Sequence, residues 1–298
     1  MKHAFLVMTH NNFEILHKTL LLLDSKDNDF YIHVDKKSVG FNQEDIVKGI
    51  KESNIYFVES MNVMWGAYSQ IECELVLLEA SVKGGYDYYH LLSGVDMPIK
   101  TCGYIHDFFE EYRGYNFLVF REKPSEHKAL LNRIRYYYPN PQAYVKNTMV
   151  HMLYNAAFLV AEKTNLFQKK FLYEKESYRF GANWFSITDD LANYVVSIKD
   201  IIAKQYRGSL CCDEIFLHTL IYNSRFKDTV FGGTDNFNYK YCLRFIDWTR
   251  GNPYVFRDED IDELLNAGEC FLFARKFDYQ NYPHVVDGLY NILIKDGY

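Results

Sequence analysis

Long apolar runs, cysteine pairs and an excess of basic residues are all missing from this sequence. It has no run of about 18 apolar residues, so no segment is predicted to span a membrane. Its six cysteines form no CxxC pair, and the adjacent Cys211 and Cys212 are poorly placed to bridge each other. This pattern argues against zinc and a disulfide framework and favours a reducing cytosol. The net charge of −6 argues against nucleic acid as a partner.

The short motifs of several enzyme classes are also missing. There is no GxSxG elbow, no Walker loop and no GxGxxG. His10 and His33 occur without the HxH or HExxH spacing of common metal sites, so no metal site is predicted. A metal-dependent phosphoesterase that uses His10, His33 and Asp35 remains an alternative, which sensitivity to EDTA would favour.

Length and composition fit a folded protein. The 298 residues suffice for one large domain or two small ones, and 48% of them are hydrophobic. Aromatic residues reach 17%, with 26 tyrosines and 23 phenylalanines. Such residues can form surfaces that contact sugars, or they can simply fill the core, and composition alone leaves both interpretations open.

Strand-like and helix-like patterns alternate in the first third of the chain. Apolar runs predict strands over residues 4–8, 30–34, 55–58 and 86–92, and helical periodicity predicts helices over 13–23 and 69–83. A strand over 185–188 and a helix over 214–222 are predicted further on, whereas residues 110–180 are less regular. This alternation predicts an α/β domain with a central, mainly parallel twisted sheet flanked by helices.

Three polar residues directly follow predicted strands. His10, Asp35 and Asp96 lie just after the first, second and fourth strands. Because the carboxyl ends of parallel strands meet at one edge of the sheet, we expect these three side chains to gather there. Asp35 and Asp96 could equally be turn residues whose side chains bond their own backbone.

Two adjacent pairs of charged residues suggest complementary chemistry. Asp213-Glu214 opens a predicted helix, and Arg275-Lys276 lies in an apolar, strand-like run. The carboxylates could remove a proton, and the cations could hold an anionic leaving group without a metal. The alternatives are acidic capping of a helix and a solvated edge strand. In a regular strand Arg275 and Lys276 would point to opposite faces, so both could reach one anion only if the strand bends or ends there.

Eight segments, each weak alone, occur in the order typical of one enzyme family and span nearly the whole chain. They are residues 5–10, 32–37, 65–69, 90–100, 181–188, 213–214, 243–248 and 272–278. With them the chain resembles the core 2/I-branching β-1,6-N-acetylglucosaminyltransferases and their relatives, the peptide O-xylosyltransferases. The resemblance implies one GT-A-like domain over residues 1–298, with a nucleotide-binding half at 1–110 and an acceptor-binding and catalytic half at 111–298.

The resemblance also implies a reaction and a set of roles. The reaction is an inverting transfer from a UDP-sugar, with GlcNAc expected and xylose as the alternative, to a hydroxyl of a glycan or lipid-linked oligosaccharide. No cofactor or metal is expected, because the segment before Asp96 supplies only one carboxylate of a DxD motif. Glu214 matches the general base. Arg275 and Lys276 match the diphosphate-binding pair, with Arg250, or else Arg244, as a further cation. Residues expected around the nucleotide are His10, Asp35, Trp65 and Gly66; those expected at the donor or acceptor sugar are Asp96, Trp184, Asp213 and Glu122.

The chain departs from animal members of the family in ways that bear on its location. It shows no N-terminal membrane anchor, stem or paired luminal cysteines. We therefore expect a bacterial, cytoplasmic enzyme of surface-polysaccharide biosynthesis, with peripheral contact at the inner membrane face through the aromatic and basic stretch 133–138. A non-catalytic carbohydrate-binding protein on the same fold is the alternative, and an assay of sugar transfer or donor hydrolysis would separate the two.

Overall fold

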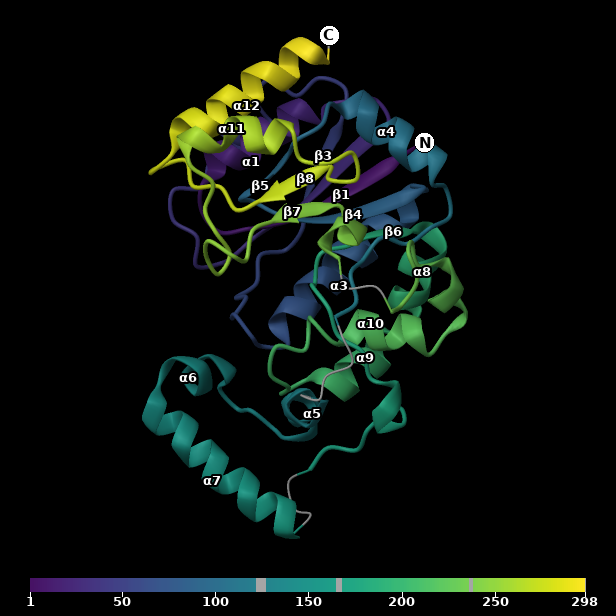
Figure 1. The fold of residues 1–298 in the computed structure, drawn as a ribbon, viewed down its shortest axis with the longest axis vertical. Helices are drawn as coiled ribbons and strands as arrows, with labels where there is room; N and C mark the ends of the chain where they lie inside the picture. Colours follow the sequence, from purple (N-terminus) through teal and green to yellow (C-terminus); the bar gives the residue numbers. More distant parts are fainter. Residues whose placement is uncertain (122–126, 165–167, 236–237, 298) are drawn as a thin grey trace.

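A five-stranded sheet with the order β3-β2-β1-β4-β6 forms the centre of the molecule (Figure 1). The computed structural model describes residues 1–121, 127–164, 168–235 and 238–297. Strands β1 to β4 run parallel, and β6 pairs antiparallel with β4. A second sheet of three short strands has the order β5-β8-β7. The strands are β1 (His3–Thr9), β2 (Asn28–Val34), β3 (Asn54–Phe57), β4 (Tyr88–Ser93), β5 (Asp96–Pro98), β6 (Ser186–Thr188), β7 (Arg244–Ile246) and β8 (Phe273–Arg275).

Helices cover both faces of the large sheet. Residues of β1 alternate between two cores: Ala4 and Leu6 pack on the side of α3, α8 and α10, and Phe5 and Val7 pack on the side of α1 and α4. A sheet buried on both faces explains why the run from Ala4 to Met8 in β1 is apolar on both sides. The helices are α1 (Phe13–Leu22), α2 (Gln43–Val47), α3 (Ser69–Ser81), α4 (Cys102–Glu111), α5 (His127–Arg135), α6 (Pro141–Lys146), α7 (Thr148–Thr164), α8 (Asp189–Ser197), α9 (Lys199–Tyr206), α10 (Phe216–Tyr222), α11 (Ile261–Leu265) and α12 (Pro283–Asp296).

The small sheet joins the end of the chain to the large sheet. Asp96 of β5 is opposite Arg275 of β8, and Ile246 of β7 flanks Arg275 on the other side. A third core holds this sheet against α1 and the C-terminal helix α12. Both sheets therefore combine strands from before and after residue 110, so the chain folds back on itself to complete each one.

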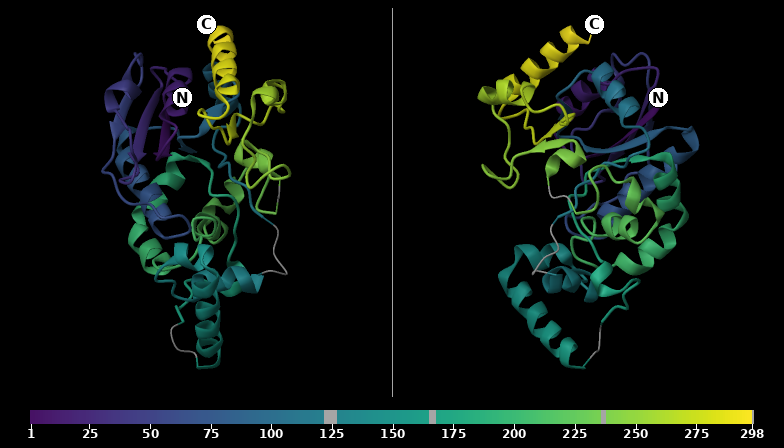
Figure 2. Two further views of the ribbon diagram at one scale, coloured as in Figure 1. Left: turned by 90° about the vertical axis from the view of Figure 1, so that its left-hand side faces the viewer. Right: turned by 45° about the vertical axis from the view of Figure 1, so that its right-hand side comes forward.

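At the end of the molecule opposite α12, α6 and α7 project away from both sheets (Figures 1 and 2). Among the described residues, one side of α7 packs against other elements, through Tyr154, Phe158 and Ala161, which contact Tyr136 and Tyr138. Among the residues that the structure describes, no helix combines the length and the apolar character needed to cross a bilayer.

The predicted α/β class is confirmed, and most element positions agree within two residues. The main difference concerns the helix predicted over 214–222, which begins at Phe216. Asp213 and Glu214 lie in the turn before α10, where the amide of Ile215 donates to Cys212 O. Acidic capping of a first helical turn is thus wrong as an account of this pair. Both residues lie in a connection between elements, where functional side chains often occur.

Candidate active site

A cavity of about 390 Å³ opens at the carboxyl edge of β1 and β2. Its size is in the range of pockets that bind small ligands. His10, Asp35 and Trp65 all contribute to its wall, so three of the residues predicted around one ligand do meet there. The other residues of the wall are Met8, Thr9, His33, Lys37, Val63, Gln70 and Gln142.

Asp35 has a structural task as well as a place in the cavity wall. One carboxylate oxygen accepts from the Lys37 amide at 2.9 Å, and the other accepts from the Val63 amide at 3.1 Å. The Asx turn that the sequence left open is therefore present. It fixes the chain after β2 and ties the loop before Trp65 to the sheet edge.

Positive charge gathers around His10. Partial burial and the cations of Lys276, Lys37 and Arg275 together lower the pKa of His10, although Asp35 opposes them. A lowered pKa leaves this ring neutral at pH 7. The cations come from two distant parts of the chain, the turn after β2 and the end of β8, so the fold assembles a basic surface on one side of the cavity.

The geometry of the described residues does not favour a metal site formed by His10, His33 and Asp35. Nε2 of His33 accepts from the Met61 amide at 3.0 Å, and both Asp35 oxygens are engaged as described above. Within the described ranges, no group of three or more His, Cys, Asp or Glu side chains is arranged to hold a metal ion. The geometry therefore gives no support to a phosphoesterase built on His10, His33 and Asp35.

Gln70 of α3 connects the cavity to the acidic turn before α10. Its amide nitrogen donates to Asp213 Oδ2 at 2.9 Å, and its amide oxygen accepts from the Gly66 backbone. The Gly66 carbonyl in turn accepts from Cys211 at 2.8 Å. Gly66 has a φ of 74°, a conformation that favours glycine. The Trp65-Gly66 loop and the Asp213-Glu214 turn are thus held together as one wall.

The two carboxylates of this turn have different environments. Burial and the neighbouring Glu214 raise the pKa of Asp213 to about 7. Asp213 is buried with Glu74 of α3 nearby, and burial together with Asp213 raises the pKa of Glu74 well above its usual value. Glu214 is more open, with about a third of its side chain exposed at 36%. Of the two, Glu214 is the one that a substrate could reach.

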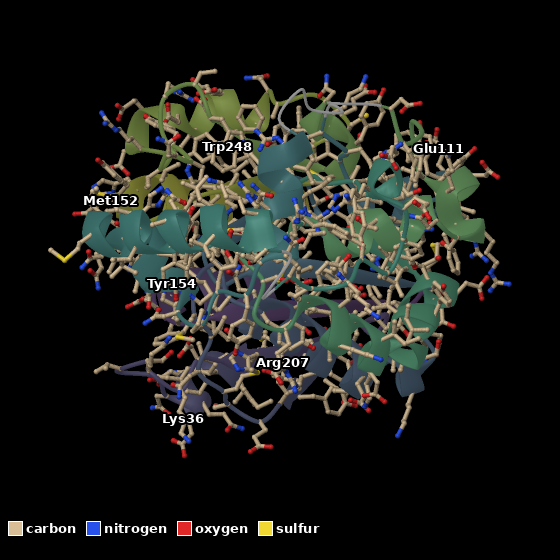
Figure 3. All side chains as sticks on the ribbon, turned by 90° about the horizontal axis from the view of Figure 1, so that it is seen from below. Lys36, Glu111, Met152, Tyr154, Arg207 and Trp248 are labelled. Atoms are coloured by element: carbon tan, nitrogen blue, oxygen red, sulfur yellow. The ribbon has the colours of Figure 1, made fainter. Side chains whose placement is uncertain are left out.

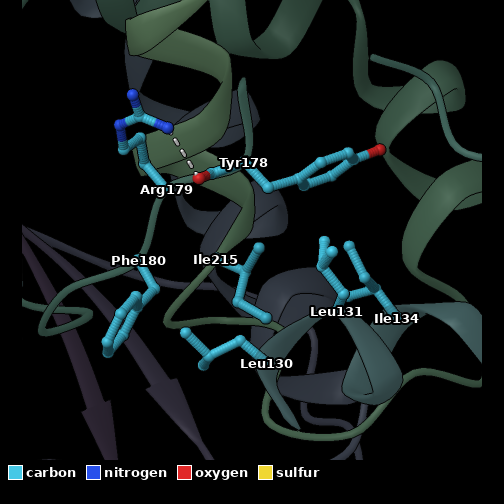
Figure 4. A pocket seen from close by; sticks show the side chains of 7 residues that line it. All are labelled: Leu130, Leu131, Ile134, Tyr178, Arg179, Phe180 and Ile215. Atoms are coloured by element: carbon cyan, nitrogen blue, oxygen red, sulfur yellow. Dashed lines mark hydrogen bonds between the residues drawn. The ribbon is translucent and has the colours of Figure 1, made fainter. Parts of the chain in front are cut away.

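Arg133 of α5 holds Glu214 in place. Its guanidinium donates to Glu214 Oε2 at 2.9 Å. The adjacent residue, Ile215, lines a narrow apolar pocket with Leu130, Leu131 and Ile134 of α5 (Figure 4). Packing and an ion pair together therefore fix the turn against α5.

Arg275 is held on three sides. Its guanidinium donates to Ser93 Oγ and, at 2.7 Å, to Asp96 Oδ1, and it lies 4.2 Å from the centre of the Trp184 ring. Asp96 is fully buried, and its other oxygen accepts from the Ser93 amide at 2.8 Å. The expectation that Asp96 contacts a sugar is therefore not supported, because its oxygens face Ser93 and Arg275. Trp184 is also largely buried and supports the arginine with its ring face.

Strand β8 ends at Arg275, so strand alternation does not constrain Lys276. Both side chains are close enough to His10 to act on its pKa. Because the strand ends at this pair, both side chains can reach one anion. A solvated edge strand is a poor description of Arg275, whose side chain is only 18% exposed.

The other predicted cations have different partners. Arg250 forms ion pairs with Asp247, Asp260 and Glu263. Arg244 is fully buried and donates to Ser186 Oγ and to the carbonyls of Leu91, Phe185 and Cys242. Neither guanidinium is directed at the cavity, so the geometry does not support a diphosphate-binding role for either. Glu122 lies outside the described residues.

Four residues of the site were not predicted from the sequence. Arg133 lies 81 positions from Glu214, and Gln70 lies 143 positions from Asp213. Lys37 and Gln142 also line the cavity: Lys37 belongs to the family segment 32–37 but had no predicted role, and Gln142 belongs to no recognisable motif. Arg133 begins the aromatic and basic stretch 133–138, but that stretch suggested membrane contact rather than a carboxylate partner.

The model of the Core-2/I-Branching enzyme family matches residues 3–264 of the chain. Among curated proteins, human xylosyltransferase 1 is 24% identical over 96% of this chain, and the Ciona intestinalis xylosyltransferase is 25% identical over 92%. The chain spans about a third of the length of these relatives, 31% and 32% respectively. Among solved structures, core-mannan synthase A of Aspergillus fumigatus in an Mn/GDP form matches 74% of this chain and 69% of its own, at 13% identity and a TM-score of 0.34. That score is too low to support an argument.

Proposed function

The chain belongs to the Core-2/I-Branching enzyme family, and on this basis we propose that it is an inverting glycosyltransferase that moves a sugar from UDP to a hydroxyl of a glycan or lipid-linked oligosaccharide. The observation that carries the proposal is the convergence of groups at one cavity. Three distant parts of the chain contribute: Trp65 is a stacking surface in the cavity wall, Arg275 and Lys276 are two adjacent cations that act on His10 of that wall, and Glu214 is an accessible carboxylate in the turn that Gln70 joins to the Trp65-Gly66 loop.

The donor would bind along the basic side of the cavity. Trp65 is 55% exposed although it is a large aromatic residue at a cavity wall, and it offers a flat face to a uracil or sugar ring. Arg275 and Lys276 would contact the diphosphate. Because Asp96, Ser93 and Trp184 already fix Arg275, little ordering would be needed when the anion arrives.

Inversion requires one displacement at the anomeric carbon. Glu214 would take the proton of the acceptor hydroxyl as its oxygen forms the new bond to that carbon, and the bond from the carbon to the UDP oxygen would break. The charge that develops on the diphosphate would be balanced by Arg275 and Lys276. Arg133 would keep the Glu214 carboxylate oriented toward the acceptor. We propose that these two cations take the place of a metal ion.

Two further choices belong to the proposal. We propose GlcNAc as the donor sugar; the curated relatives named above are xylosyltransferases, so xylose is the competing donor. A non-catalytic carbohydrate-binding protein would use the same cavity, but it would need neither the Glu214–Arg133 pair nor a second cation beside Arg275.

A thermal-shift screen of UDP-GlcNAc, UDP-xylose and UDP, each with and without EDTA, tests the proposal. Binding of a UDP compound in EDTA, followed by donor hydrolysis or transfer in EDTA, is the expected result. Activity that EDTA abolishes and manganese restores would contradict the cation-pair mechanism. Stabilisation by glycans but by no UDP compound would favour the carbohydrate-binding alternative.

A further inference from the structure

Helix α7 has two apolar faces, and the described part of the chain covers one of them. Tyr154, Phe158 and Ala161 face the rest of the molecule, with the Phe158 ring stacked 4.4 Å from that of Tyr136. The outer face consists of residues that recur at helical spacing on the other side of the helix: Met149, Met152, Leu153, Ala156, Leu159 and Val160. In Figure 3 the Met152 side chain extends outward from the helix, away from the other elements.

This outer face is the main concentration of exposed apolar side chains on the described surface. Its five large residues, Met149, Met152, Leu153, Leu159 and Val160, are between 61% and 73% exposed. Across the described part of the chain, Val39 is the one other large hydrophobic residue that is more than 60% exposed. A contiguous apolar patch on a helix that projects from the molecule is typical of an interaction surface.

The region around the outer face is basic although the protein is acidic. Residues 127–170 contain seven lysines and arginines and a single acidic residue, Glu162, which gives this segment a net charge of +6, against −6 for the whole chain. Three of these lysines, Lys146, Lys163 and Lys170, are exposed. Lys163 lies in the same helical arc as the apolar residues, near the C-terminal end of α7, where a long side chain can keep its charge in a polar layer.

We propose that α7 is an interfacial membrane-binding helix that inserts its outer face into the headgroup layer of a bilayer containing anionic lipids. Apolar side chains would enter the boundary of the acyl chains, and Lys146, Lys163 and Lys170 would contact lipid phosphates. The two parts act together, because a modest apolar face and a few cations each bind a bilayer weakly alone.

Charge favours a lipid surface over a second copy of this chain. Two copies that paired through this face would bring two sets of exposed lysines, Lys146, Lys163 and Lys170, closer together, and like charges would oppose their association. An anionic bilayer offers the opposite sign to the same cations. Lys163 shares the helical arc of the apolar residues, and Lys146 ends the helix that precedes α7, so exposed cations accompany the apolar face near both ends of α7.

The connection between α6 and α7 links the outer face to the cavity. Gln142 of α6 lines the cavity, and α7 follows α6 after a single residue. A membrane bound at α7 would therefore keep the cavity near lipid headgroups, where the sugar of a lipid-linked acceptor is found. This last step rests on the proposed function, whereas membrane binding itself does not.

Flotation of the full chain with lipid vesicles tests the proposal. At low and at high salt, vesicles of phosphatidylcholine alone would be compared with anionic vesicles in which about a third of the lipid is phosphatidylglycerol. We expect binding to the anionic vesicles that falls with salt. Reversing three charges, in Lys146→Glu/Lys163→Glu/Lys170→Glu, should weaken the partition coefficient by about 100-fold. Met152→Asp should weaken it by roughly tenfold.

Matched control variants change residues outside α6 and α7. Val39→Asp places the same charge at another exposed apolar residue, and Lys26→Glu/Lys48→Glu/Lys51→Glu reverses three exposed lysines; both should bind vesicles as wild type does. Circular dichroism would establish that every variant is folded. Calorimetric binding of UDP, measured without lipid, tests the proposed function separately.

Three outcomes would overturn the proposal. The first is no binding to either kind of vesicle by the folded wild-type protein. The second is equal binding to both kinds, unaffected by the α7 variants. The third is a dimer in sedimentation that Met152→Asp dissociates, without vesicle binding, which would make the outer face a contact between copies of the chain.

Discussion

Lys276 is the residue at which the proposed diphosphate site can be tested most cleanly. A charge-assisted contact contributes roughly 1.5–3 kcal/mol, so Lys276→Ala should weaken UDP binding by about tenfold or more. Titration calorimetry measures this directly. Lys36→Ala is the control, because Lys36 is an exposed lysine that is not among the cations described above as acting on His10; its loss should leave UDP affinity unchanged.

Arg275→Ala should weaken UDP binding as well, but with a second effect. It leaves the buried Asp96 without its guanidinium partner, which destabilises the fold in addition. Thermal unfolding without UDP separates the two effects. Unchanged UDP affinity in both the Lys276→Ala and the Arg275→Ala proteins would remove this pair from the diphosphate site.

Glu214 should separate chemistry from donor binding. Glu214→Gln keeps the shape and a hydrogen bond acceptor for Arg133, but it cannot take up the acceptor proton. We expect turnover to fall by about 100-fold or more, the scale of losing a general base, with UDP affinity near that of wild type. Steady-state kinetics with a glycan acceptor would measure it.

Two companion variants complete the Glu214 test. Arg133→Gln should lower turnover less than Glu214→Gln does, with partial rescue in Arg133→Lys, because Arg133 acts through the position of the carboxylate. Glu79→Gln, an exposed change on α3, serves as the control. If Glu214→Gln turned over like wild type, another group would have to be the base.

Glu74 should make the free energy of unfolding decrease as pH rises. Neither of its carboxyl oxygens has a hydrogen bond partner within the described structure, and burial followed by Asp213 raises its pKa well above 4.5. The folded state thus holds this proton more tightly than the unfolded state, so stability is lost as pH rises from about 4.5 toward the folded pKa. The loss is about 1.4 kcal/mol for each pH unit in that window.

Glu74→Gln removes this titration while keeping the shape of the neutral acid. The unfolding free energy of Glu74→Gln, relative to wild type, should increase between pH 5 and pH 8 in denaturant titrations. Glu79→Gln, on the exposed side of the same helix, should show a constant difference. A constant difference for Glu74→Gln too would mean that Glu74 is ionised inside the fold.

At the scale of elements, the connection between β4 and β5 depends on its close approach to β1. The Gly94 amide donates to Met8 O at 2.9 Å, and a Cβ at Gly94 would lie 2.1 Å from Thr9 Oγ1 and 3.3 Å from Thr9 Cα. This contact positions the turn that leads to Asp96, and Asp96 in turn holds Arg275, one of the cations that act on His10. The glycine therefore positions cations that it does not touch.

Gly94→Ala should push the β4–β5 turn away from the end of β1. We expect a loss of about 1–3 kcal/mol of stability, typical of overpacking, and weaker UDP binding, because Arg275 moves with the turn. Gly103→Ala is the control, since nothing lies within 4 Å of a Cβ there and alanine favours the helix α4. Full UDP affinity in a folded Gly94→Ala protein would show that the turn does not position the cations.

For the whole molecule, buried histidines should set the acid limit of stability. His3 and His90 meet at 3.0 Å in the core between β1 and β4. Burial lowers the pKa of both well below 6.5, with a further contribution from His106 for His3 and from His3 for His90. Burial also lowers the pKa of His218 to about 3. All three are neutral in the fold, so below pH 6.5 the unfolded state takes up protons that the folded state refuses.

Each of these histidines should lower the free energy of unfolding by up to about 1.4 kcal/mol for each pH unit below 6.5. The denaturation midpoint of wild type should therefore fall steeply between pH 6.5 and pH 5. His218→Gln should fall less steeply than wild type, and His284→Gln, an exposed change on α12, should follow wild type. Parallel curves for His218→Gln and wild type would show that His218 is not the source.

The sequence by itself determined the elements and their class. Apolar runs with period two or 3.6 reflect backbone geometry and neighbours a few residues away, so the strands β1 to β4 and the helices α1 and α3 could be predicted within about two residues. The rule that functional groups follow parallel strands placed His10 and Asp35 at one edge. The position of Trp65 at the same cavity came from resemblance, and it too agrees with the structure.

Only the tertiary structure decided which charges meet. Glu214 pairs with Arg133, Asp96 pairs with Arg275 across 179 positions, and Arg250 turns to Asp247 rather than to the cavity. The same holds for α7, whose two apolar faces look alike in sequence although one is packed and the other is exposed. The physical reason is that these ion pairs, and the burial of one face of α7, depend on how whole elements pack together and exclude water. Residues that are close together in the sequence do not determine that packing.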